Sequence, residues 1–235
     1  MRTDPSAGTA LAPMLLSPAV LGGRGGGTGA TRSGLPKLPR AGRCAAEPTL
    51  YLLVFDNSGS MVGGNYCTGR RFEEAHHALS SIGRRCRCHK ELAAVLHFDQ
   101  PNSGDLPPLP LRSFHRQVPA LSAPRDGAGC SLLGPSLARA TELARKHPDH
   151  HCVLMVFSDF ELFDRDVPAR LAAFGRFPGT PHAFVMRAPV PPMLARESRV
   201  VVTPVSETAP AGTAALAVHA ALTRRRAQTR GRAVP

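Results

Sequence analysis

The segment Thr49–Phe55, which is apolar from Leu50 onward, constrains the fold of this chain more than any other part of it. A strand without alternating polar residues is typical of a parallel sheet that is buried on both faces. Further strands are expected at Leu92–Phe98, Val153–Phe157, Pro181–Met186 and Arg199–Val205. The chain therefore predicts a central sheet that needs a layer of helices on each side.

Segments with helical periodicity separate these strands. In Arg71–Ile82, apolar residues recur every three to four positions, which is one face of a helix, and Glu73 and Glu74 are expected on the exposed side. The other expected elements are helices at Ser131–Lys146, Val167–Phe177 and Ala209–Arg225, a proline-rich loop at Pro101–Pro110 and a short edge strand at Leu111–His115. This alternation predicts an α/β fold, a three-layer, doubly wound and mostly parallel sheet flanked by helices.

A loop rich in oxygen atoms, Asp56-Asn57-Ser58-Gly59-Ser60, directly follows the first strand. Asp56 offers a carboxylate, and Ser58 and Ser60 offer hydroxyl oxygens two residues apart. Gly59 lets the loop turn back so that these side chains can face one point. Oxygen ligands of this kind suit magnesium, which usually keeps several waters. Because open α/β sheets bind ligands at the carboxyl ends of their strands, we expect a metal site here.

Three motifs together resemble the metal-ion-dependent adhesion site of von Willebrand factor type A domains. Asp56-Asn57-Ser58-Gly59-Ser60 is similar to the D-x-S-G-S motif of that family. In the stretch Gly129–Leu137, Ser131 stands where the family's G-T-x-x-G pattern has its threonine. Asp159 follows the strand Val153–Phe157 and resembles the third motif, an aspartate after a buried strand. The resemblance covers roughly residues 48–222 and implies the doubly wound, Rossmann-like fold of this family.

The resemblance also implies a metal site. Its residues would be Asp56, Ser58, Ser60, Ser131 and Asp159, and its ion Mg²⁺ or Mn²⁺. In the family's geometry the three hydroxyls contact the ion directly, and the two carboxylates act mainly through waters. One coordination position remains for an Asp or Glu of a protein partner. The implied function is metal-ion-dependent protein–protein interaction, as a scaffold or adaptor, and not catalysis.

Two positions depart from the family pattern. Ser131 lacks the methyl group that stiffens a threonine side chain, so it is expected to hold the ion less firmly. Phe160 follows Asp159 where glycine is usual, and this bulky residue is expected to narrow access to the site.

The domain boundaries are expected near residues 47 and 222. Residues 1–47 are rich in Gly, Pro and Arg and are expected to be a disordered lead before a domain at 48–222. Residues 223–235 form a basic tail with five arginines and no acidic residue, and much of the net charge of +12 lies in the two end segments. An alternative function is nucleic-acid association through these tails. It is disfavoured because the chain has no Trp and two Tyr for base stacking.

The six cysteines match no familiar disulfide or zinc-finger spacing. Cys86-Arg87-Cys88-His89 could bind zinc together with His150 or His151, but no second C-x-x-C completes such a site. Reduced thiols and a cytoplasmic location are the expectation, since the chain shows neither a clear signal peptide nor an apolar run long enough to span a membrane.

Two further alternatives concern the oxygen site. An enzyme using a strand-end aspartate and magnesium would need a second carboxylate two residues later, where Ser58 stands. The sequence also lacks a P-loop and a G-x-S-x-G elbow, which argues against an enzyme. A degenerate domain that keeps the fold and binds no ion is the remaining alternative.

Overall fold

The computed structural model describes residues 35–62, 68–98, 104–117 and 129–228. The sheet contains six strands in the order β3-β2-β1-β4-β5-β6. Their bounds are β1 Thr49–Phe55, β2 Glu91–His97, β3 Leu106–Pro110, β4 His151–Ser158, β5 Thr180–Met186 and β6 Val201–Val205. β3 is antiparallel to β2, and the other neighbours are parallel. The mostly parallel sheet expected from the apolar segments is confirmed.

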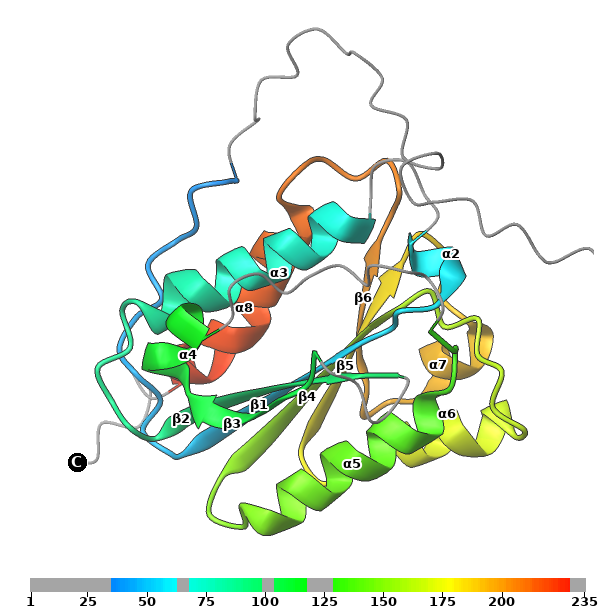
Figure 1. Cartoon of the computed structure of the whole chain (residues 1–235), viewed down its shortest axis with the longest axis horizontal. Coiled ribbons are helices and arrows are strands. Elements are labelled where there is room, and N and C mark those ends of the chain that lie inside the picture. Colours follow the sequence, from blue (N-terminus) through cyan, green and yellow to red (C-terminus); the bar gives the residue numbers. More distant parts are fainter. Residues whose placement is uncertain (1–34, 63–67, 99–103, 118–128, 229–235) are drawn as a thin grey trace, which may run out of the picture. The chain divides into compact units, whose positions relative to one another are not determined.

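Helices cover both faces of this sheet (Figure 1). One layer contains α3 (Thr68–Gly83), α4 (Leu111–Gln117) and α8 (Thr213–Gln228). The opposite layer contains α5 (Leu133–Lys146), α6 (Val167–Gly175) and α7 (Pro192–Arg196). A single-turn helix, α2 (Gly59–Val62), begins just after β1. The fold is therefore the three-layer, doubly wound α/β arrangement predicted from the sequence.

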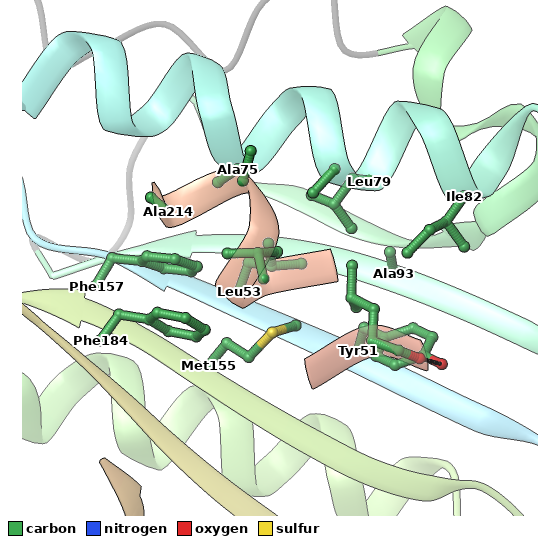
Figure 2. Packing of buried hydrophobic residues seen from close by; sticks show 14 of the residues in the cluster. Tyr51, Leu53, Ala75, Leu79, Ile82, Ala93, Met155, Phe157, Phe184 and Ala214 are labelled. Atoms are coloured by element: carbon green, nitrogen blue, oxygen red, sulfur yellow. Dashed lines mark hydrogen bonds between the residues drawn. The ribbon is translucent and has the colours of Figure 1, made fainter. Parts of the chain in front are cut away.

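The central strand β1 is buried along its whole length because its alternate side chains enter two different cores. Tyr51, Leu53 and Phe55 face the layer of α3 and α8, whereas Leu50, Leu52 and Val54 face α5 and α6. Figure 2 shows Leu53 packed below Ala75 and Leu79 of α3. Burying an aliphatic side chain of this size contributes about 1.5–3 kcal/mol to stability, so β1 fixes the sheet to both helical layers.

The region after β2 differs from the sequence prediction. Leu106–Pro110, expected within a proline-rich loop, forms the edge strand β3, and Leu111–His115, expected as a strand, lies in helix α4. Proline is tolerated in β3 because this strand pairs on one side only, so the missing N–H groups can face away from the ladder. Leu111 and Phe114 are three residues apart and both buried, which is a helical spacing.

The packed domain is longer at both ends than the composition predicted. Leu38, Ala41 and Ala45 of the expected lead are buried, although residues 1–34 lie outside the described part of the chain. Helix α8 continues into the expected basic tail, and the Arg226 side chain is 1% exposed, in an ion pair with Glu91. Residues 229–235 are also outside the described residues. Arg226 therefore belongs to the fold and is not available to a nucleic acid.

The sequence predicts Glu74 on the exposed face of its helix, and this prediction is wrong. Its side chain is completely buried and accepts hydrogen bonds from the backbone N–H groups of Gly212, Ala214 and Ala215 at 2.8, 2.9 and 3.2 Å. The N–H groups at the start of a helix have no partner within the helix, and a carboxylate is a favourable acceptor for them. Glu74 thus fixes the start of α8 from α3. None of the described helices has the length and apolar character needed to cross a membrane.

Candidate functional site

The candidate site lies at the point where the strand order of the sheet reverses. The chain runs outward from β1 through β2 to β3, and then from β4 through β5 to β6 on the other side of β1. In open α/β sheets, ligands bind outside the carboxyl ends of the two strands that flank such a point. Asp56 follows β1 and Asp159 follows β4, so both predicted carboxylates stand at this position.

Asp56 is held by hydrogen bonds from the ends of both strands. Its backbone N–H donates to the Phe157 carbonyl at 3.0 Å. Its carboxylate accepts from the Ser158 hydroxyl at 2.6 Å and from the Ser58 N–H at 2.9 Å. Both oxygens of Asp56 are therefore oriented by neighbours before any ligand arrives.

The electrostatics at this edge favour a bound cation. Asp56 is completely buried and Asp159 is 5% exposed. Burial raises the pKa of Asp56 above its ordinary value, against the hydrogen bonds from Ser158 and Ser58, and the charge of Asp159 raises it further. Within the described part of the chain, neither carboxylate forms an ion pair. Two neighbouring buried carboxylates without a positive partner are costly, and a divalent cation would compensate both charges.

The hydroxyl groups of Ser58 and Ser60 lie close together, with 3.1 Å between their oxygens. Two adjacent ligands of an octahedral magnesium ion, each about 2.1 Å from the metal, are separated by about 3.0 Å. The observed spacing therefore fits two ligands on one edge of such a shell. Ser58 is buried and Ser60 is exposed, so the pair spans the boundary between the protein and solvent.

The third predicted segment meets the first through a close backbone contact. Gly129 forms a parallel bridge with Ser58, two residues before Ser131. A Cβ atom at position 129 would lie 2.5 Å from the Asn57 carbonyl oxygen, so only glycine permits this approach. Ser131, which is 3% exposed, accepts a hydrogen bond at its carbonyl from the Phe163 N–H at 2.9 Å. The structure thus brings together the segments that carry all five predicted site residues.

Sequence reasoning missed Asp164, which connects two of these segments. Its carboxylate accepts from the N–H groups of Leu133 and Gly134 at 2.8 and 3.0 Å. Helix α5 begins at Leu133, and no side chain of its own N-cap position serves this purpose. Asp164 therefore caps α5 from the loop after β4, and it ties the Ser131 segment to the Asp159 segment. No sequence pattern indicated this pairing, because the two segments are 30 residues apart.

The side chain of Phe160, which was expected to narrow access to the site, lies in the core instead. Its φ of 59° lies in the left-handed region, where glycine is favoured and a bulky residue is unusual. The side chain is 5% exposed and packs against Phe174 of α6, with 6.4 Å between ring centroids. The ring is thus part of the core below α6, and burial there offsets the cost of the backbone conformation, about 1–3 kcal/mol.

A basic residue, Arg187, also reaches this edge of the sheet. It follows β5, and its guanidinium donates a hydrogen bond to the Ser60 carbonyl oxygen. It also lies 3.9 Å from the Glu207 carboxylate and is 30% exposed. A positive group beside the Ser60 loop would attract an acidic ligand, and no motif in the sequence indicated its presence there.

Comparison with solved structures places this fold among known domains, whereas no family model and no curated protein sequence matches the chain. A von Willebrand factor type A structure from Catenulispora acidiphila matches with a TM-score of 0.54 and 15% identity, over 77% of this chain and 43% of that one. An aerotolerance-related membrane protein from Bacteroides fragilis matches with a TM-score of 0.53 and 14% identity, over 75% of this chain and 99% of that one. The conserved hypothetical protein BatB from Bacteroides thetaiotaomicron matches with a TM-score of 0.54 and 13% identity, over 78% of this chain and 99% of that one.

At these identities the matches show the fold alone. This chain spans less than half of the Catenulispora structure and nearly all of the two Bacteroides structures. The strand order, the two helical layers and the structural matches agree on one conclusion. The described domain has the fold of a von Willebrand factor type A domain.

Proposed function

We propose that this domain binds a protein partner through a divalent cation held at the carboxyl edge of its sheet. The residues that would hold Mg²⁺ or Mn²⁺ are Asp56, Ser58, Ser60, Ser131 and Asp159. The observation that carries the proposal is the buried pair of carboxylates, Asp56 and Asp159, which forms no ion pair among the described residues. Asp56 accepts from the N–H of Ser58, whose hydroxyl lies 3.1 Å from that of Ser60.

The chemistry of these ligands favours an acidic partner. Hydroxyl oxygens carry no charge, so an ion bound mainly by serines keeps part of its positive charge. An Asp or Glu side chain of a partner would complete the coordination shell and neutralise the rest. Arg187 adds a second positive group at the same edge. Ser158 would act as a positioning residue, because its hydroxyl orients the Asp56 carboxylate at 2.6 Å.

A peptide-display selection tests this proposal and does not require the partner to be identified first. Peptides are captured on the immobilised full chain in Mg²⁺ and eluted with EDTA. We expect the captured peptides to share an Asp or Glu, and replacement of that residue by Asn or Gln to abolish binding. Asp56→Asn should capture none, whereas Asp166→Asn should behave like the wild type because Asp166 caps α6 on the surface. Equal capture in EDTA, or by the Asp56 variant, would remove the metal from the mechanism.

A further inference from the structure

A group of thiols lies at the opposite, amino-terminal edge of the sheet. Cys44 comes from the segment before β1, and Cys86 and Cys88 come from the turn between α3 and β2. Glu91 is the first residue of β2, opposite Thr49 in the parallel register. One ligand atom from each of the four residues lies within 4.8 Å of the others. The fold has thus brought three sulfur atoms and a carboxylate oxygen to one point.

The distances in this cluster match those around a tetrahedral metal ion. The Sγ atoms of Cys44 and Cys86 are 3.7 Å apart, and those of Cys86 and Cys88 are 3.5 Å apart. Sulfur ligands at about 2.3 Å from tetrahedral zinc are separated by about 3.8 Å. A disulfide would need about 2.05 Å. The Glu91 Oε2 atom lies 3.1 and 3.4 Å from the two sulfurs of the turn, a separation that also suits a shared ion.

Neighbouring groups hold the carboxylate in place. Arg226 from α8 donates to both oxygens of Glu91, at 2.9 and 2.5 Å, and the Tyr51 hydroxyl donates to Oε1 at 3.3 Å. Glu91 and Arg226 are both almost completely buried. Such partners orient a ligating carboxylate and offset part of its negative charge. They are the support that a closed, structural metal site requires.

Basic residues lie close to the cluster in the sequence. The turn that carries Cys86 and Cys88 contains four exposed basic residues, Arg84, Arg85, Arg87 and Lys90. Positive charges near sulfur stabilise the thiolate form that binds a metal ion.

We propose that Cys44, Cys86 and Cys88, with the Glu91 carboxylate, form a structural zinc site that fastens the segment before β1 to the α3–β2 turn. On binding, each thiol releases its proton to solvent and the sulfur bonds to the ion. Soft thiolates select zinc over magnesium, so this site and the oxygen site take different ions. His89, His150 and His151, which the sequence suggested as zinc ligands, do not belong to this group of ligand atoms. His89 is exposed, and His151 contacts Thr180 at 3.0 Å.

Metal analysis of the full chain tests this inference. The protein is expressed with added zinc, kept under reductant and separated by gel filtration before elemental mass spectrometry. We expect about one zinc per chain in the wild type and background zinc in Cys86→Ser. Cys152→Ser, which removes a buried thiol of β4 outside the cluster, should keep its zinc. Asp56→Asn should also keep it, which separates this inference from the proposed function.

A second measurement guards against a variant that fails to fold. Cobalt in place of zinc in the wild type should give a thiolate-to-cobalt charge-transfer band and the intense visible bands of tetrahedral cobalt. Cys88→His should keep the metal and weaken the charge-transfer band, since one of three thiolates is lost. Zinc-free wild type, zinc retained by Cys86→Ser, copper or iron in place of zinc, a disulfide in the cluster, or the weak spectrum of octahedral cobalt would each overturn the inference.

Discussion

At its carboxyl end β1 leads into a cluster of carboxylate and hydroxyl oxygens, whereas its amino end lies beside three thiols and a buried ion pair. The oxygen cluster opens to solvent at Ser60 and has no positive partner for its two carboxylates among the described residues. The thiol cluster is more enclosed, and its carboxylate is paired with Arg226. An edge that is open to solvent and carries unpaired carboxylates suits the binding of a cation and a partner. An enclosed edge whose carboxylate is paired suits stabilisation of the fold.

Helix α8 connects the two edges. Its first turn is fixed by Glu74 near the carboxyl end of the sheet, and its last turn by Glu91 at the amino end. Both glutamates are completely buried, yet one accepts from backbone N–H groups and the other from a guanidinium. Because of this difference, we expect mutations at the two edges to lower the free energy of unfolding by unequal amounts.

The largest effect is expected at the amino edge. In zinc-free protein, Arg226→Met should lower the free energy of unfolding by about 3–5 kcal/mol, because it leaves the Glu91 carboxylate buried without its positive partner. Urea unfolding followed by circular dichroism measures this. Arg224→Met on the same helix is the control, since Arg224 is exposed and should change stability by less than about 0.5 kcal/mol. Equal effects of the two variants would mean that the end of α8 is a solvated tail.

Glu74→Ala should cost less, about 2–3 kcal/mol, because it removes the buried carboxylate itself and the backbone N–H groups at the start of α8 lose their acceptor. Glu73→Ala is a matched control, as the neighbouring glutamate of the same helix is exposed. The same unfolding measurement compares them. A larger loss for Glu74→Ala than for Arg226→Met would reverse the proposed ranking of the two edges.

A smaller effect is expected at the carboxyl edge itself. Asp164→Ala should lower stability by about 1 kcal/mol through loss of the α5 cap. It should also weaken Mn²⁺ binding, because the Ser131 segment is no longer tied to the loop after β4. Asp166→Ala, which removes the cap of α6, should reduce stability and leave Mn²⁺ affinity unchanged. Thermal unfolding and Mn²⁺ titration of both variants separate capping from assembly of the site.

The smallest effect is the coupling between the edges. β1 has 7 residues, which at about 3.3 Å each separates its ends by roughly 20 Å. The stability changes of Asp56→Asn and Cys86→Ser should therefore add within about 0.5 kcal/mol in the double variant. A double-mutant cycle measures this, and a coupling well above that value would show that the two clusters are one unit.

The two edges also differ in what the sequence could predict. The loop at Asp56–Ser60 is contiguous and follows an apolar strand, so its position at the carboxyl edge could be predicted. Cys44, Glu91 and Arg226 come from distant segments without a characteristic spacing, and only the folded chain brings them to one point. Local patterns likewise indicated the strands and most helices. They failed at Glu74 and Asp164, whose partners are the ends of other helices.

Titration of Mn²⁺ into the purified full chain decides whether the carboxyl edge holds a divalent cation. We expect saturable binding of about one ion per chain at the carboxyl edge, with loss of binding in Asp56→Asn and retention in Cys86→Ser. Such binding must also raise the Tm of the wild type, because the ion would bind only the folded state. No saturable binding to the wild type, or equal binding by Asp56→Asn, would mean that the carboxyl edge is not a metal site.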